Sequence, residues 1–598
     1  MPRRLELLLL SVILTTAFYL RSVEIEAVYL NIHAERDLWR SLEMLRGEAF
    51  HHTGAELTLG GRTPGNLLYL LHAVPLLFTT HPGGLLVWLA FLHTATVALL
   101  WHTGRQHWGA GVGLLAAGAM ATWPLAVLHL RYLWNPAYIA PLVAVFVWAT
   151  LHWASTRHAS RAPLAIAALL AMLQVHVSAV FLVLALVVLW WLMSLPFDAR
   201  AARHTALLAA VLLAPYAVGE IATGAANTRA LLIQQPRTLT TVNDAQIEIG
   251  RWIETRFNRG SLKALQVVLS PVFYDQRTET GSFSYLHWMA ESLPTLGQPP
   301  WLLRTVMLLH HLRWPIAAAV LGAMGWLAWV AWRGRASWRA NTPPHEGRLA
   351  LVLVALMAAP IIGNIVLAVM VTPVAGGIVG VGVPRYFFVL MPTMFLVVAV
   401  GIGSIVAAFP RARHLMLAVV VMVLVLQAVV SRTAVWAATS TGRMFRYSLH
   451  QSFTYAAQRE AADVLMEWNI TPGGFTAHLE ALDHLFDNTT YSVSNLEQSL
   501  DWAYIHHPRH EEALVAPRGD APARAVVLAD LSRTPSPHAA VAAQGWTLVA
   551  ERRVGGPWTG PRAGQPGDLV LMLVEGDDLP SHRYSPVRNM WVKMVPRR

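Results

Sequence analysis

The sequence has no cysteine and few charged residues. None of its 598 residues is Cys, and only 13% are Asp, Glu, Lys or Arg, whereas about a quarter of a soluble domain is charged. The absence of cysteine excludes disulfide bonds, thiol catalysis and cysteine-ligated zinc. The scarcity of charge, together with a hydrophobic fraction of 55%, excludes an ordinary soluble protein.

Long apolar runs recur along the chain, each close to the roughly 20 residues with which a helix crosses a bilayer. The first run is expected to be retained, because no small-residue cleavage site follows it. The run at 65–80 is short and predicts a re-entrant or interfacial helix. The expected fold class is mainly α, a polytopic helical membrane protein. We expect eleven spans, at residues 5–22, 83–103, 109–129, 136–154, 162–177, 178–196, 204–222, 313–332, 349–372, 385–408 and 413–430.

Arginines mark one side of this map. With the N-terminus inside, the inner segments contain thirteen arginines and two acids, which together equal the net charge of +11 of the whole protein. The positive-inside rule then predicts a cytoplasmic N-terminus, and the basic composition reflects topology rather than a nucleic-acid partner. The residues concerned are Arg3, Arg4, Arg105, Arg157, Arg161, Arg200, Arg203, Arg333, Arg335, Arg339, Arg348, Arg411 and Arg413, with the acids Asp198 and Glu346.

Three long segments lie outside on this map: 23–82, 223–312 and the tail from 431. The tail is polar and punctuated by Pro and Gly, which predicts a small soluble α/β domain at 431–598 beside a transmembrane module at 1–430. A helix is expected at 452–468. Strands are expected at 523–529, 546–554 and 568–575.

The first outer segment contains the charged stretch "IHAERDLWRSLEMLRGEAF". Apolar residues at positions 38, 39, 42 and 45 share one helical face, which predicts a helix lying flat at the membrane surface. Asp37 immediately precedes this helix and is expected either to cap it or to act in catalysis. Glu35 is expected in the preceding loop, where it is solvated or acts beside Asp37.

Two further outer motifs carry cations. In "GGRTPGNLLYLL" the Gly and Pro residues predict a turn that holds Arg62 before a second interfacial helix. In "PRYFFVLMP" the residues Arg385 and Tyr386 stand at the outer start of a span. Arg385 there is either a snorkelling arginine beside an aromatic belt residue or a guanidinium that holds a phosphate.

With these motifs the chain resembles the GT-C superfamily of glycosyltransferases, and in particular the bacterial relatives of protein O-mannosyltransferases and of lipid A aminoarabinose transferase. The resemblance covers about residues 1–430 and rests on the order of loose motifs. It departs from the family in three places: an Arg separates the two acids in "AERD", the family's Pro-Pro is replaced by "RTPG", and the WWD signature of oligosaccharyltransferases is absent. The motifs are "AERD", "GGRTPGNLLYLL", "HTGRQHWGAGVGLLAAGAMATWP", "RYLWNPAYIAP", "QVHVSAVF" and "PRYFFVLMP".

The resemblance implies an inverting glycosyltransferase in the inner (plasma) membrane, acting at the extracytoplasmic face on a polyprenyl-phosphate-linked sugar. The acceptor would be a hydroxyl of a glycan, lipid or protein. Asp37 is the expected general base, with Glu35 as its partner or replacement. Arg385, with Tyr386 beside it, is the expected phosphate clamp. The further donor-binding candidates are Arg62, Arg131 and His176.

Alternatives from other classes stay open at this point. Proteins with many spans are often transporters, here a transporter or flippase of lipid-linked saccharides, although acids are scarce within the expected spans. A non-catalytic lipid-linked assembly factor is a third interpretation. No cofactor is indicated with certainty. A divalent metal ion near Glu35 and Asp37 is a candidate that the sequence does not decide, and the histidine clusters at 478–484 and 506–510 match no standard zinc spacing.

Overall fold

The computed structural model describes most of the hydrophobic region and part of the tail. It divides into two compact units, each described by itself below: Met1–Val23, His51–Pro75 and Gly84–Ala437 form the first, and Glu24–Phe50, Leu76–Gly83 and Ala438–Arg598 form the second. The described residues are 1–25, 32–47, 49–55, 57, 61–79, 82–131, 133–232, 275–278, 281–284, 299–339, 346–371, 388–441, 464, 467–468, 524–530, 536–543, 545–554 and 569–575.

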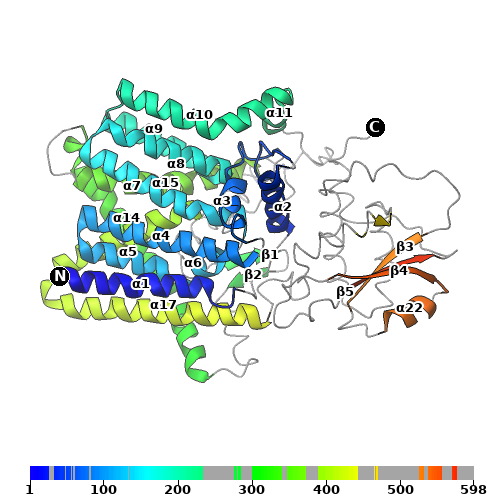
Figure 1. Ribbon diagram of the computed structural model, residues 1–598. Coiled ribbons are helices and arrows are strands. Elements are labelled where there is room, and N and C mark those ends of the chain that lie inside the picture. Colours follow the sequence, from blue (N-terminus) through cyan, green and yellow to red (C-terminus); the bar gives the residue numbers. More distant parts are fainter. Residues whose placement is uncertain are drawn as a thin grey trace, which may run out of the picture. The chain divides into compact units, whose positions relative to one another are not determined.

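The first unit is a bundle whose long helices run roughly parallel to one another (Figure 1). A helix coincides with each of the eleven expected spans, because an uninterrupted apolar run must satisfy its backbone hydrogen bonds within itself to enter a membrane. The helices are α1 (Arg3–Ser22), α4 (Pro82–Trp108), α5 (Ala110–Thr122) with α6 (Pro124–His129), α7 (Ile139–Thr156), α8 (Ala162–Val175), α9 (Val180–Met193), α10 (Ala199–Ala222), α14 (Pro300–Arg333), α15 (Glu346–Val371), α16 (Met391–Ala408) and α17 (Arg413–Thr441).

Within the described residues, seven helices are long and apolar enough to cross a membrane, and the protein is a multi-pass membrane protein. The expected spans at 109–129, 162–177 and 178–196 correspond to shorter apolar helices of 10–17 residues. The span through α7 is 72% buried within the protein and the span through α10 only 6%. Figure 1 shows α10 at one edge of the bundle and α17 at the other, and apolar side chains of both helices are exposed in the structure.

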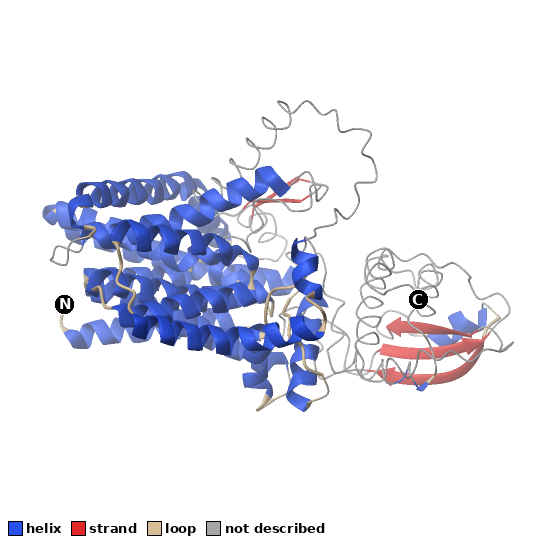
Figure 2. Ribbon diagram, turned by 90° about the horizontal axis from the view of Figure 1, so that it is seen from above, coloured by secondary structure: helices blue, strands red, loops and turns tan. Residues whose placement is uncertain are grey.

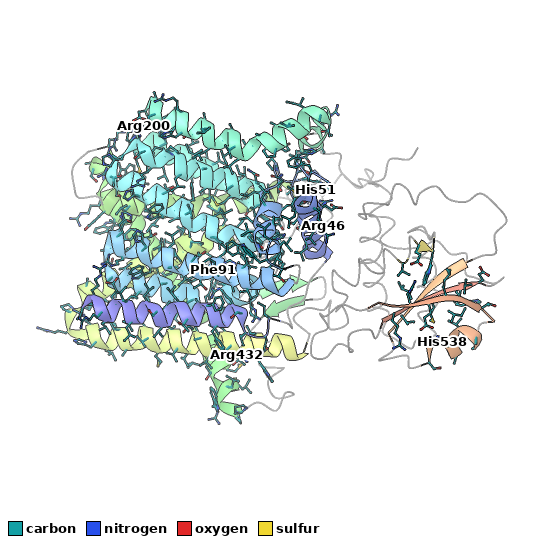
Figure 3. All side chains as sticks on the ribbon, viewed as in Figure 1. Arg46, His51, Phe91, Arg200, Arg432 and His538 are labelled. Carbon is teal, nitrogen blue, oxygen red and sulfur yellow. The ribbon has the colours of Figure 1, made fainter. Side chains whose placement is uncertain are left out.

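Side-chain contacts show which helix ends lie together. Arg105, near the end of α4, donates to Glu6 near the start of α1 at 2.7 Å, and Gln106 contacts His152 near the end of α7 at 2.7 Å. Arg157, which follows α7, donates to the carbonyl of Met193, the last residue of α9, at 2.9 Å. We call this the N-terminal end of the bundle, and the other the distal end. Figure 3 shows Arg200 and Arg432 towards the two ends.

A buried arginine joins two helices at the distal end. Arg21, in the last turn of α1, is 2% exposed and donates to the carbonyls of Ala17, Met120 and Ala121 at 2.9–3.1 Å. The last carbonyls of a helix have no partner within the helix, so this guanidinium satisfies the end of α5. The contact joins α1 to α5 at the distal end.

A short helix follows the Arg62 turn, as the sequence predicts. Helix α3 (Leu67–Leu76) includes Pro75, and its positions Leu68, Tyr69 and His72 are fully buried. It is too short to cross a bilayer, and its re-entrant or interfacial placement stays a prediction. A short hairpin, β1 (Asp275–Thr278) with β2 (Gly281–Ser284), is also described.

In the second unit, three strands form an antiparallel sheet in the order β3-β5-β4 (Figure 2). The strands β3 (Arg524–Asp530), β4 (Thr547–Val554) and β5 (Leu569–Glu575) agree with the three expected strands to within one residue at every end. Residues Val570–Val574 are all buried, and because successive side chains point to opposite faces, both faces of the central strand β5 are covered. Helix α22 (Pro537–Ala543) connects β3 to β4. The helix expected at 452–468 lies almost wholly outside the described residues.

Candidate functional site

Asp37 lies inside a helix rather than before one. Helix α2 (Ile32–Arg46) already begins at Ile32, because Ala, Glu and Arg at positions 34–36 favour a helix. The expectation that Asp37 is an N-cap is therefore wrong, as is the placement of Glu35 in a loop. Asp37 stands in the second turn, where the helix macrodipole has little effect.

Helix α2 is enclosed along its middle, on more than one side. A helix lying flat at a membrane surface keeps its polar face solvated, yet polar residues of α2 are buried while Leu45 is 37% exposed. The expected interfacial helix is therefore wrong in its burial pattern. The enclosed residues are Asp37 at 1%, Leu38 at 2%, Arg40 at 2%, Ser41 at 0%, Leu42 at 3% and Glu43 at 8% exposure.

Asp37, Arg40 and Ser41 share one face of α2, three and four positions apart. The Ser41 hydroxyl donates to the main-chain carbonyl of Asp37 at 2.6 Å, so it serves the helix backbone and not the carboxylate. Carboxylates are almost never fully buried unless they are paired, and Arg40 supplies a buried cation one turn away. Glu35 stands two positions from Asp37, and positions two apart in a helix do not face each other.

Arg131 is buried at the distal end of the first unit, where it binds the end of α1. It is 6% exposed, and its guanidinium donates to the carbonyls of Leu20, at 3.4 Å, and Val23. A guanidinium commonly satisfies the free carbonyls of a helix C-terminus in this way. Arg131 therefore has a structural role that the sequence did not reveal.

His176 lies between α8 and the 3-10 helix η4 (Val177–Ala179). Its Nδ1 accepts a hydrogen bond from the Ser178 main chain at 3.2 Å and contacts the Ser178 hydroxyl at 2.9 Å. The side chain thus caps η4. Any contact of this imidazole with a ligand would have to involve Nε2.

Arg62 lies in the predicted turn, and Asn227 holds its main chain. The Arg62 N–H donates to Asn227 Oδ1 at 2.7 Å, and Asn227 Nδ2 donates to the Arg62 carbonyl at 3.1 Å. This amide pairs with the backbone as a neighbouring strand would. Asn227 belongs to α11 (Ala226–Leu232), which follows α10.

The sequence did not predict the cluster of polar side chains where α10 meets α11. Glu220 accepts from the main-chain N–H groups of Asn227 and Thr228 at 3.1 and 2.7 Å and so caps α11. The Tyr216 hydroxyl contacts Thr228 at 2.9 Å. The local signal was the turn "TGAAN", where Gly224 and Ala225 have positive φ angles of 62° and 60°, but nothing local indicates Arg62 as the partner.

The turn that carries Arg62 also packs on the end of α8. A Cβ atom built on Gly65 would lie 2.1 Å from Oε1 of Gln174, two residues before His176. Asn135 donates to the Val175 carbonyl at 2.9 Å, which brings the segment after Arg131 to the same helix end. Arg62, Arg131 and His176 are thus gathered at the distal end, on elements that contact one another.

Several expected site residues are not described. Arg385 and Tyr386 lie outside the described residues, and the side chain of Glu35 is not described either. No three His, Asp or Glu side chains gather as metal ligands within the described part of the chain. The candidate divalent ion beside Glu35 and Asp37 therefore stays a prediction.

No protein-family model and no curated protein sequence matches the chain. Among solved structures, it is similar to ArnT from Cupriavidus metallidurans bound to undecaprenyl phosphate. The TM-score is 0.46 at 12% identity, over 96% of this chain and 99% of ArnT. The apo form of ArnT gives a TM-score of 0.47 at 12% identity, over 96% of this chain and 98% of ArnT.

The chain is also similar to the archaeal oligosaccharyltransferase AglB from Archaeoglobus fulgidus in complex with an inhibitory peptide and a dolichol-phosphate. The TM-score is 0.37 at 12% identity, over 83% of this chain and 60% of AglB. At these identities and TM-scores, the likeness assigns no role to any residue.

Proposed function

We propose that the chain is an integral membrane glycosyltransferase. It moves a sugar from a polyprenyl-phosphate donor to an acceptor hydroxyl at the extracytoplasmic face of the plasma membrane. The donor class comes from the resemblance of the sequence motifs to GT-C enzymes. The single observation that carries the catalytic part is the buried carboxylate of Asp37, which is 1% exposed on α2.

In this proposal Asp37 is the general base. It takes the proton of the acceptor hydroxyl while that oxygen forms a bond to the anomeric carbon of the sugar. The bond from that carbon to the polyprenyl-phosphate oxygen breaks, and its electron pair leaves with the phosphate. One in-line displacement inverts the anomeric carbon. The burial of Asp37 supports this role, because a hydrogen bond between its carboxylate and the acceptor hydroxyl is stronger where water is excluded.

The leaving phosphate requires cationic stabilisation. We keep Arg385, with Tyr386, as the proposed clamp. Among the described candidates, Arg131 and His176 already serve helix ends through their side chains. Arg62 lies in the turn that packs on the end of α8, and we propose it as a further described cation to test for donor binding.

The distribution of acids favours this proposal over a transporter. Ion-coupled transporters place acidic groups near the middle of their spans. In the described bundle helices named above, the acids stand in terminal turns: Glu6 in α1, Glu220 in α10 and Glu346 in α15. Glu6 accepts from Trp101 and Arg105 at 3.1 and 2.7 Å, which is a structural contact.

The test is the variant Asp37→Asn in the purified full-length protein. The amide keeps the shape of the side chain but cannot take a proton, so we expect transfer to fall by about a hundredfold to ten-thousandfold. Binding of a polyprenyl-phosphate sugar should stay near the wild-type level. Transfer is measured with radiolabelled donor, and donor binding by copurification and mass spectrometry of the lipid-linked sugar.

The matched control is Glu43→Gln, the same change at another buried acid of α2, which is 8% exposed. It should keep most of the transfer rate, because Glu43 has no proposed chemical role. Equal losses in both variants would mean that α2 is structural. Wild-type turnover in Asp37→Asn would remove the main chemical support for the proposal, and Glu35→Gln would then be examined as the alternative base.

A further inference from the structure

An exposed stripe of tryptophans ends helix α14. Trp326, Trp329 and Trp332 stand three positions apart and are 46%, 46% and 64% exposed. The rings of Trp326 and Trp329 lie 4.9 Å apart between centroids. Exposed indoles near the end of a spanning helix are typical of the membrane–water interface, where one part of the ring is apolar and the N–H is solvated.

Guanidinium groups lie over two of these rings. The Arg333 guanidinium carbon is 5.1 Å from the Trp329 centroid, and that of Arg335 is 4.6 Å from the Trp332 centroid. Within the described residues, neither arginine forms an ion pair with a carboxylate. Stacking holds each guanidinium group against an aromatic ring, and no described carboxylate neutralises its charge.

The charged surface continues onto the end of α9. Arg339 donates to the Leu192 carbonyl at 3.2 Å. Arg157 donates to the carbonyls of Ser194, at 2.8 Å, and Trp338, at 3.4 Å. These contacts join the ends of α9 and α14, and they place the Arg339 guanidinium beside the exposed end of α9.

Among the described residues, no acid forms an ion pair with the arginines of this surface. Glu346 begins α15 beside Gly347, whose Cα packs against Gly334 at the end of α14, and it forms no ion pair with a described cation. Asp198 caps α10 by accepting from Ala201 at 2.7 Å. Within the described residues, the net charge of the surface is therefore positive.

We propose that Arg333, Arg335 and Arg339, with Trp329 and Trp332, form a binding surface for the headgroup of an anionic phospholipid. A guanidinium presents a planar fork that fits a phosphate bidentately, and basic groups at the ends of spanning helices bind anionic headgroups. The stacked rings hold the forks in place and pack against the upper acyl chains. The surface lies at the N-terminal end of the bundle, so it is separate from the proposed donor site at the distal end.

The experiment is native mass spectrometry of the full-length protein in detergent, titrated with phosphatidylglycerol or phosphatidylcholine. The wild-type protein should bind the first phosphatidylglycerol more tightly than the first phosphatidylcholine. The double variant Arg333→Gln/Arg335→Gln should weaken phosphatidylglycerol binding about tenfold or more, since each basic residue contributes appreciably at an anionic surface. Phosphatidylcholine binding should change little.

Two comparisons separate a built surface from bulk charge. Arg411→Gln/Arg413→Gln removes the same charge from exposed arginines at the same end of the bundle and should leave the lipid preference in place. Trp329→Leu/Trp332→Leu keeps all the charge but removes the rings and should also weaken phosphatidylglycerol binding. Equal losses in the two arginine pairs, or an unchanged preference in Arg333→Gln/Arg335→Gln, would overturn the proposal.

Discussion

Single side chains at the distal end act mainly through the main chain of other segments. Arg131 binds the last carbonyls of α1, and Asn227 pairs with both main-chain polar groups of Arg62. A polar group enclosed in a membrane protein must find a partner, because the cost of leaving it unsatisfied is high. The candidate cations of the site are therefore also part of the scaffold, and their substitution tests both roles at once.

The variant Asn227→Ala tests how much the pairing of Asn227 with the Arg62 main chain contributes to stability. The variant leaves the Arg62 N–H and carbonyl without their described partner, so we expect a loss of about 1–3 kcal/mol in stability. The measurement is the thermal unfolding midpoint in detergent. Thr223→Ala, four residues before Asn227, is the control, because the Thr223 hydroxyl donates to Gly219 of the preceding helix and to no other described residue. If the two variants unfold alike, the pairing with Arg62 contributes nothing measurable.

At the scale of elements, the decisive contact is between the Arg62 turn and the end of α8. Gly65 has a φ of +115° and faces the Gln174 side chain directly. Gln174 cannot easily move away, because its Nε2 donates to the Leu212 carbonyl in α10 at 2.9 Å. The turn, α8 and α10 are therefore linked through one buried amide.

Gly65→Ala should break this link. The added methyl meets Gln174 Oε1 at 2.1 Å, and we expect a loss of about 2–4 kcal/mol from backbone strain and the lost hydrogen bond. Gly109→Ala is the matched control, since Gly109 also has a positive φ of +94° but meets nothing within 4 Å. Thermal unfolding in detergent compares the two. An equal loss in both variants would show that strain alone, and not the contact with α8, sets the cost.

At the scale of the whole molecule, the helices alternate in direction and gather arginine at the N-terminal end of the bundle. Arg105, Arg157, Arg200 and Arg333 all stand at helix ends on that side. The proposed orientation, with this end in the cytoplasm, follows from the positive-inside rule. The proposed function depends on it, because lipid-linked sugar and acceptor must meet at the opposite face.

The native chain has no cysteine, so single-cysteine variants report orientation without background. Ser160→Cys lies at the N-terminal end, Thr223→Cys at the distal end and Ser536→Cys before α22, and all three positions are exposed. In intact cells an impermeant maleimide should label the second and third but label Ser160→Cys only after permeabilisation. Labelling of Ser160→Cys alone in intact cells would reverse the orientation and exclude the proposed function.

The sequence by itself determined the elements whose cause is local. Apolar run length decided the bundle helices, and the two-residue alternation with turn signals decided β3, β4 and β5, because both patterns depend on neighbours within a few residues. Counting spans and arginines assigned each helix end to one of the two ends of the bundle. The resemblance of the motifs named Arg62, Arg131 and His176 as donor-binding candidates, and their role stays a prediction.

Only the tertiary structure decided what each polar side chain contacts. The burial of Asp37 depends on what encloses α2, which no periodicity within the helix reports. Asn227 meets Arg62 across 165 positions, and Arg131 meets Val23 across 108. Such contacts form because a buried N–H, carbonyl or guanidinium takes whatever partner folding brings within reach, and that partner is set by the packing of helices distant in sequence.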